Sequence, residues 1–317
     1  MGLWRESRSN RAKANLESGM SQEIIHDPLL LDCVKTENYL AVALGIRSCS
    51  FVTIPAEFPG GYELGRKIDE LCVEDLQAVM SADAAEKQAL MKRLKERIQE
   101  AFRKVVLSSD VYKAHIKWSK QLFLKTYNVE VRPSICELYL FRESRIKKAL
   151  EKLMRVRESE REKLRLGRDV KRKKVNLAYA EEMSSEYLSS LGRLLGYPFC
   201  CVRSYINDRL NEDMTVEIRS SRQIEGLGNQ LEDPEIHAFF AKDFFPCKPE
   251  CQKAIRIGKS IFDNLNALDP KLGDLYLGCV RRNVEMVRRY PQLIEQHKKN
   301  LNKRTREFAD MVHGLKT

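Results

Sequence analysis

Long apolar runs are missing from this 317-residue chain. Its two longest uncharged apolar stretches, residues 39–46 and 48–56, are separated by Arg47 and are much shorter than the ~20 residues that cross a bilayer. The first twenty residues contain four basic side chains but lack the apolar core of a secretory signal. We therefore expect a protein without a membrane span that resides in the cytoplasm.

Several signature motifs of enzymes are missing as well. The chain has no G-x-x-x-x-G-K-[ST] phosphate loop, no H-E-x-x-H zinc motif and no G-x-S-x-G nucleophile motif. The segment Gly226-Leu227-Gly228 does not complete the dinucleotide motif G-x-G-x-x-G and follows no predicted strand. The sequence motifs therefore indicate no particular enzymatic reaction.

The positive charge of the chain is concentrated in two stretches. Lys and Arg number 56 against 45 Asp and Glu, a net charge of +11, and residues 155–174 and 281–317 each contribute +6. This distribution favours a polyanionic partner, RNA or the ribosome, although well-solvated helices explain the same charge in a chain with 32% charged residues. The residues that we expect to contact nucleic acid are Arg168, Lys171, Arg172, Lys173, Lys174, Arg281, Arg282, Arg288 and Arg289.

The spacing of apolar residues predicts many helices and a few strands. Residues 49–54, 127–132 and 136–141 are rich in β-branched and aromatic side chains, and the last two segments are so close that they predict an antiparallel hairpin. Residues 81–106 form the clearest predicted helix, with Ser81 as its cap. We expect a predominantly α-helical α+β fold, with a small antiparallel sheet in the N-terminal half and a helical, cysteine-bearing C-terminal half.

Changes in composition divide the chain into four segments. We expect a flexible polar arm at residues 1–22, an α+β domain at 23–160, a basic linker at 161–175 and a helical cysteine-cluster domain with basic C-terminal helices at 176–317. The long apolar stripe near the C-terminus contains Pro291, where we expect a break in the helix.

Four of the nine cysteines stand out by their spacing. Cys200 and Cys201 are adjacent, and Cys247 and Cys251 are four residues apart. In a chain without a secretory signal this arrangement favours metal binding or thiol chemistry over disulfides. The other five cysteines are single and are typical of small buried apolar residues: Cys33, Cys49, Cys72, Cys136 and Cys279.

Both cysteine pairs are predicted to lie at the start of a helix, where free backbone N–H groups favour the thiolate. Four thiolates suit Zn²⁺ or an iron–sulfur cluster. Because directly adjacent cysteines seldom bind the same ion, we expect one of Cys200 and Cys201 to be a bystander and His237 to replace it among the ligands. Redox or catalytic thiols, disulfides and a chance arrangement remain open alternatives.

The segments GYPFCCVRSYIND and FFPCKPECQKAIRIGKSI resemble a known family. Across residues 185–265 the chain is similar to the archaeal "domain of unknown function 483" proteins, in which we expect a GYPxCC element followed by PCxxxC. The resemblance implies an archaeal cytoplasmic source and a shared cysteine site at Cys200, Cys201, Cys247 and Cys251. It implies no activity.

Two functions are compatible with these features. In the first, the cysteines form a structural metal site in a binding protein whose basic surfaces contact RNA or the ribosome. In the alternative, the protein is a metal-dependent, cluster-dependent or thiol-based enzyme, with the cysteines in the active site and Tyr197, Arg203, Glu225 or His237 close to the substrate. A closed four-ligand centre favours the first function, and an open coordination position favours the second.

Overall fold

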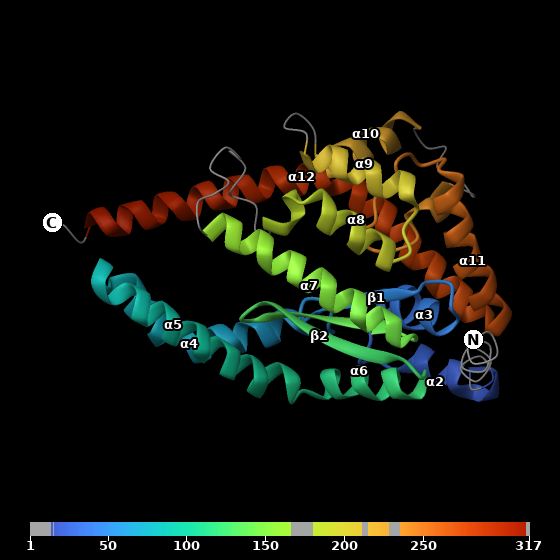
Figure 1. The fold of residues 1–317 in the computed structure, drawn as a ribbon, viewed down its shortest axis with the longest axis horizontal. Helices are drawn as coiled ribbons and strands as arrows, with labels where there is room; N and C mark the ends of the chain where they lie inside the picture. Colours follow the sequence, from blue (N-terminus) through green and yellow to red (C-terminus); the bar gives the residue numbers. More distant parts are fainter. Residues whose placement is uncertain (1–13, 15, 166–179, 211–214, 228–234, 315–317) are drawn as a thin grey trace.

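The computed structural model describes residues 14, 16–165, 180–210, 215–227 and 235–314, and most of these residues are helical (Figure 1). A three-stranded antiparallel sheet lies among the helices of the N-terminal half. The predicted fold class, α+β with a predominance of helix, is confirmed. None of the helices in the described part of the chain combines the length and the apolar character that a membrane span requires.

The sheet has the strand order β1-β3-β2 and is antiparallel throughout. Its strands are β1 (Cys49–Ile54), β2 (Lys125–Arg132) and β3 (Ile135–Phe141). The turn between β2 and β3 forms the predicted hairpin. Successive side chains of a strand point to opposite faces of the sheet, and both faces of β3 are buried. Each face of the sheet therefore needs its own layer of helices.

Helices from both halves of the chain cover the two faces of the sheet. On one face, Tyr139 and Phe141 pack with apolar residues of α7 (Ser144–Arg165) and α8 (Ser185–Leu194). On the other face, Leu138 and Leu140 belong to the main core together with the N-terminal helices. These are α2 (Ser21–His26), η2 (Val34–Leu40), α3 (Ala41–Ala43), α4 (Gly61–Ser81), α5 (Ala84–Phe102) and α6 (Asp110–Gln121).

The predicted helix at residues 81–106 begins slightly later than expected. Ser81 ends α4 instead of capping the next helix, and Asp83 is the residue before α5. The carboxylate of Asp83 accepts hydrogen bonds from the backbone N–H groups of Ala85 and Glu86. An aspartate cap satisfies two N–H groups that have no partner within the helix, which explains why the start lies at Asp83.

The C-terminal half is built from helices, of which α12 (Pro270–Gly314) extends along the longest axis of the view (Figure 1). After α8 they are α9 (Phe199–Leu210), α10 (Val216–Gly226), η6 (Glu235–Phe239), α11 (Gln252–Leu268) and α12. The expected break at Pro291 is wrong, because α12 continues through this residue. Proline removes one backbone hydrogen bond, and the long helix tolerates this loss.

The main core includes residues from both halves of the chain. It contains Leu16 and Leu40 from the N-terminal part and Cys201, Ile261 and Val284 from the C-terminal part. Most of the expected arm and residues 166–175 of the expected linker lie outside the described residues, whereas α7 extends to Arg165. The division into domains stays a prediction.

Candidate metal centre

The sequence Gly196-Tyr197-Pro198 ends one helix and starts the next. Gly196 adopts a left-handed conformation with φ of 75°, and its N–H and that of Tyr197 bond back to the carbonyls of Arg193 and Gly192. These two bonds form a Schellman motif, a common helix end that favours glycine. The carbonyl of Pro198 then accepts from the N–H groups of the next turn, so α9 starts immediately. Cys200 and Cys201 consequently lie in the first turn of α9.

The second cysteine pair approaches this turn from the loop before α11. Cys251 is the residue that precedes α11, with an extended backbone, and Cys247 lies one short turn earlier. The backbone N–H of Cys247 points at the sulfur of Cys201, with N and Sγ 3.4 Å apart. The two pairs therefore meet where the starts of α9 and α11 face each other.

The four sulfurs form a compact group. Cys251 Sγ lies 3.7 Å from the sulfurs of both Cys200 and Cys201, which are 4.0 Å from each other. All four sulfurs, that of Cys247 included, lie within 4.8 Å of one another. Four sulfurs placed tetrahedrally about 2.3 Å from a Zn²⁺ ion are about 3.8 Å apart. The spacing thus matches a tetrahedral four-thiolate site.

All four cysteines are free thiols. A disulfide requires sulfurs about 2.05 Å apart, which is far shorter than the separations found here. The sulfurs of both adjacent cysteines contact Cys251, so the geometry allows both to share one site, and the expectation that one of them is a bystander stays a prediction. Adjacent positions can share a site here because Cys251 lies against the helix turn that carries both of them.

The thiols do not share the same acidity. Burial raises the pKa of Cys201 well above its ordinary range, and it raises the pKa of Cys247 to about 11. Burial also opposes ionisation of Cys251, but the backbone N–H of Ala254 and the three neighbouring thiols outweigh it and lower the pKa of Cys251. A bound cation would favour ionisation of Cys201 and Cys247, the two thiols whose pKa is raised.

The loop that carries Cys247 is held in place by α10. Arg219 donates from Nη1 to the carbonyl oxygens of Pro246 and Cys247, each at 3.1 Å, and its Nε lies 2.6 Å from the carboxylate of Asp208 in α9. Gln223 also donates to the carbonyl of Cys247 at 3.1 Å. These contacts position Cys247 relative to α9 before any metal is bound.

His237 is not among the four residues whose sulfurs lie together. It lies in η6, is buried, and its ring packs against Phe262 of α11 with the ring centres 5.6 Å apart. Its backbone also lies so close to Gly258 that a side chain there would collide with the carbonyl of His237. His237 thus packs against α11.

A cavity of about 280 Å³ borders the metal centre. Cys201 contributes to its wall, together with residues of the sheet, α7, α8 and α9 and of the loop at residues 241–245. Tyr197 lines it as well, whereas Arg203 is exposed and Glu225 is exposed beside Ser221. Four of the charged residues in the lining, Glu37, Arg47, Glu57 and Lys242, belong to no sequence motif and were not predicted.

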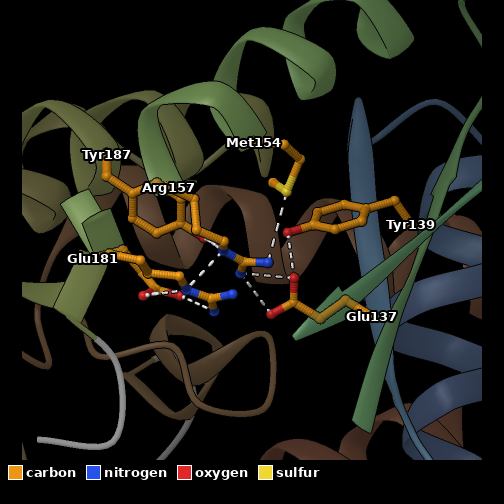
Figure 2. Close-up of polar contacts among 7 residues, drawn as sticks. Glu137, Tyr139, Met154, Arg157, Glu181 and Tyr187 are labelled. Atoms are coloured by element: carbon orange, nitrogen blue, oxygen red, sulfur yellow. Dashed lines mark hydrogen bonds and ion pairs between the residues drawn. The ribbon is translucent and has the colours of Figure 1, made fainter. Parts of the chain in front are cut away.

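One end of the cavity consists of a buried ion-pair network (Figure 2). Arg157 of α7 pairs with Glu137 of β3 at 2.9 Å and with Glu181 at 3.1 Å, and it donates to the hydroxyl of Tyr187. Arg161 adds a second contact to Glu181 at 2.8 Å. The network joins the sheet to α7, α8 and η4 (Ala180–Met183), and so it connects the two halves of the chain.

The predicted nucleic-acid residues fall into two groups. Arg168, Lys171, Arg172, Lys173 and Lys174 lie outside the described residues. The other four lie in the middle of α12, where Arg281, Arg282 and Arg289 are exposed and Arg288 is half-buried. The structure therefore places an exposed basic segment on α12.

The central part of the chain has known relatives. Residues 118–272, which contain all four cysteines, match the family described as "Protein of unknown function (DUF483)". This part of the chain is therefore similar to the DUF483 proteins. The resemblance seen in the sequence is thereby confirmed.

The relatives say little more about function. The uncharacterised protein MJ1106 of Methanocaldococcus jannaschii is 28% identical over 89 residues, which are 26% of this chain and 46% of that protein. The match thus spans less than half the length of this curated relative. No solved structure matches the chain.

Proposed function

We propose that the four cysteines bind one Zn²⁺ ion as a structural centre and that the protein functions as a binding protein. The observation that carries this proposal is the spacing of the four sulfurs, which is 3.7 to 4.0 Å among Cys200, Cys201 and Cys251 and at most 4.8 Å to Cys247. A site closed by four protein thiolates leaves no coordination position for a substrate, which is typical of structural zinc. The same feature argues against the alternative of a metal-dependent enzyme that reacts at this centre.

The spacing favours a single ion over an iron–sulfur cluster. The cysteine ligands of an iron–sulfur cluster surround a core of several iron and sulfide atoms. The sulfurs of these cysteines are therefore farther from one another than the sulfurs of four cysteines that bind a single ion. All four sulfurs here lie within 4.8 Å of one another, which leaves room for one ion between them. A cluster would require the starts of α9 and α11 to separate.

The metal assay for this proposal uses protein purified anaerobically without added metal. We expect about one zinc per chain and no visible absorption. Iron together with thiolate-to-iron absorption would contradict a zinc site. Metal-free protein that retains its stability after thorough chelation would contradict a structural role.

We also propose RNA, alone or within the ribosome, as the partner, and the cytoplasm as the location. The supporting observation is the exposed arginine group on α12, formed by Arg281, Arg282 and Arg289. Arginines that repeat along one helix can neutralise successive phosphates, and the counterions released give a strong salt dependence. The free thiols suit a reducing compartment.

A further inference from the structure

The cavity beside the metal centre is large enough for a small organic molecule. Its volume is about 280 Å³. It lies where the sheet, α8 and the loop at residues 241–245 meet, so residues from distant parts of the chain face one space. Pockets of this kind, mostly apolar with a few polar groups, are typical ligand sites.

Most charged groups that line the cavity already have an ion-pair partner. Glu57 pairs with Lys242 at 3.0 Å, and Glu182 lies 3.8 Å from Arg209. Lys242 also lies 3.9 Å from Asp243. The network of Figure 2 pairs the remaining groups, Glu137, Arg157 and Glu181. These paired side chains neutralise one another, so they do not require a charged ligand.

Arg47 and Glu37 are the two exceptions among the described residues of the lining. Arg47 is 4% exposed, and its guanidinium donates to two backbone carbonyls, that of Glu37 at 2.9 Å and that of Leu195 at 3.4 Å, without an ion pair to a carboxylate. The guanidinium also hydrogen-bonds the side chain of Tyr197 and lies 5.5 Å from the centre of its ring, and its charge lowers the pKa of the nearby Glu37 carboxyl. An arginine keeps its charge at any ordinary pH, and its planar guanidinium is suited to the two oxygens of a carboxylate.

Glu37 is the complementary group at the same end of the cavity. It is 1% exposed, and its two carboxylate oxygens accept from the backbone N–H of Lys242 at 2.7 Å and from the side chain of Asn283 at 2.9 Å. Both donors are neutral, and each oxygen retains a free lone pair. Burial raises the pKa of Glu37 to about 7, although the two hydrogen bonds and the nearby charge of Arg47 lower it.

We propose that this cavity binds a small zwitterion with an apolar side chain, an amino acid, whose carboxylate contacts Arg47 and whose ammonium group contacts Glu37. The apolar part of the lining receives the side chain, since Tyr197, Phe244 and Leu191 all face the cavity. A zwitterion supplies one negative and one positive group, which matches the two groups that have no ion pair. A simple anion or a simple cation would satisfy only one of them.

The first test is a titration of the wild-type protein with each of the twenty L-amino acids by isothermal calorimetry. We expect saturable binding, one molecule per chain, for at least one of leucine, methionine and phenylalanine. The best ligand is then compared with its decarboxylated amine and its deaminated acid, which for phenylalanine are phenethylamine and 3-phenylpropionate. Each analogue lacks one charged contact, so we expect binding to be weaker by about tenfold or more.

Two outcomes of this series overturn the proposal. Absence of binding for all twenty amino acids excludes an amino-acid site. An analogue that binds as tightly as the amino acid shows that the missing group makes no contact. The zinc content of the same sample is independent of either outcome, so a failure here does not affect the proposed metal centre.

Variants identify the residues that bind the ligand. Arg47→Met and Glu37→Gln should each weaken binding by about tenfold or more, because each removes one charged partner. The matched controls are Arg66→Met and Glu70→Gln, which alter an exposed ion pair on α4 and should leave binding unchanged. If Arg47→Met and Glu37→Gln fold and bind the amino acid as tightly as the wild type, the assignment of these two residues as ligand contacts is overturned. If either variant fails to fold, the comparison of ligand analogues on the wild-type chain decides whether the charged contacts exist.

Discussion

The cysteine centre and the cavity beside it share a wall but differ in their charge. The centre brings together four groups of the same kind, which ionise to the same sign and repel one another unless a cation lies between them. The cavity brings together groups of opposite sign, most of which form ion pairs with one another. We infer that the centre depends on its ion for stability, whereas the cavity walls are stable without a ligand.

The largest expected effect is the loss of a metal ligand. Metal binding at a structural zinc site contributes about 10 kcal/mol or more to folding, because folding and metal binding are coupled. Cys251→Ser should therefore lower the free energy of unfolding by part of this amount. Denaturant unfolding with a parallel zinc measurement checks this. Cys279→Ser is the control, since it alters a buried single thiol and should cost about 1–3 kcal/mol without loss of zinc. Equal losses of stability in both variants would show that the centre is not structural.

The next effect concerns the ion pairs that line the cavity. Arg157→Met leaves Glu137 without its cation and should lower the free energy of unfolding by about 3–5 kcal/mol. The exposed pair between Arg66 and Glu70 offers the comparison, because Arg66→Met should cost only about 0–1 kcal/mol. Similar small losses in both variants would mean that the buried network does not hold the two halves together.

A smaller effect comes from the buried carboxyl of Glu37. Burial raises its pKa from 4.5 to about 7 in the folded protein, so between these values the unfolded chain loses the proton and the folded chain keeps it. Glu37 therefore lowers stability as the pH rises from 5 to 8, by roughly 3 kcal/mol. We expect the difference in unfolding free energy between wild type and Glu37→Gln to change by this amount across that range. A difference that stays constant with pH would show that Glu37 is ionised throughout.

The smallest effect on stability is expected for the arginines of α12. Reversing Arg281, Arg282 and Arg289 to Glu should weaken RNA binding and reduce the slope of log affinity against log salt by about 2, at ~0.7 per phosphate contact on a single strand. The melting temperature should hardly change, because these side chains are exposed.

The control for this experiment reverses Lys87, Lys92 and Lys95, which are exposed on α5. We expect RNA binding by this variant to remain close to that of the wild type. Equal weakening in both variants would show only that the net positive charge attracts polyanions, and a wild-type chain that binds no RNA at ~0.15 M salt would exclude the proposed partner.

The grouping of the four cysteines was predictable because they lie in two short segments with strong local signals. Gly196 and Pro198 set the end of one helix and the start of the next, and Cys247 and Cys251 precede another helix start. The sequence could not show that both adjacent cysteines face Cys251, because that depends on how α9 and α11 pack. The β2–β3 hairpin was predictable for the same local reason.

The placement of Arg47 and Glu37 in the lining of one cavity was not predictable. Arg47 lies between two apolar stretches of the sequence, where it resembles an isolated surface charge, and Glu37 lies in a helical segment without a motif. The contacts that define their environment come from Leu195, Lys242 and Asn283, more than 140 residues farther along the chain. Only the packing of the two halves brings these groups together.

The most direct test of the central claim is X-ray absorption at the zinc edge of the protein as purified. The four-cysteine centre predicts about four sulfur neighbours at about 2.3 Å and no nitrogen or oxygen neighbour. A nitrogen neighbour at about 2.0–2.1 Å, or fewer than four sulfurs, would contradict a closed four-thiolate site. The first result would indicate that His237 is a ligand, and the second that a coordination position is open.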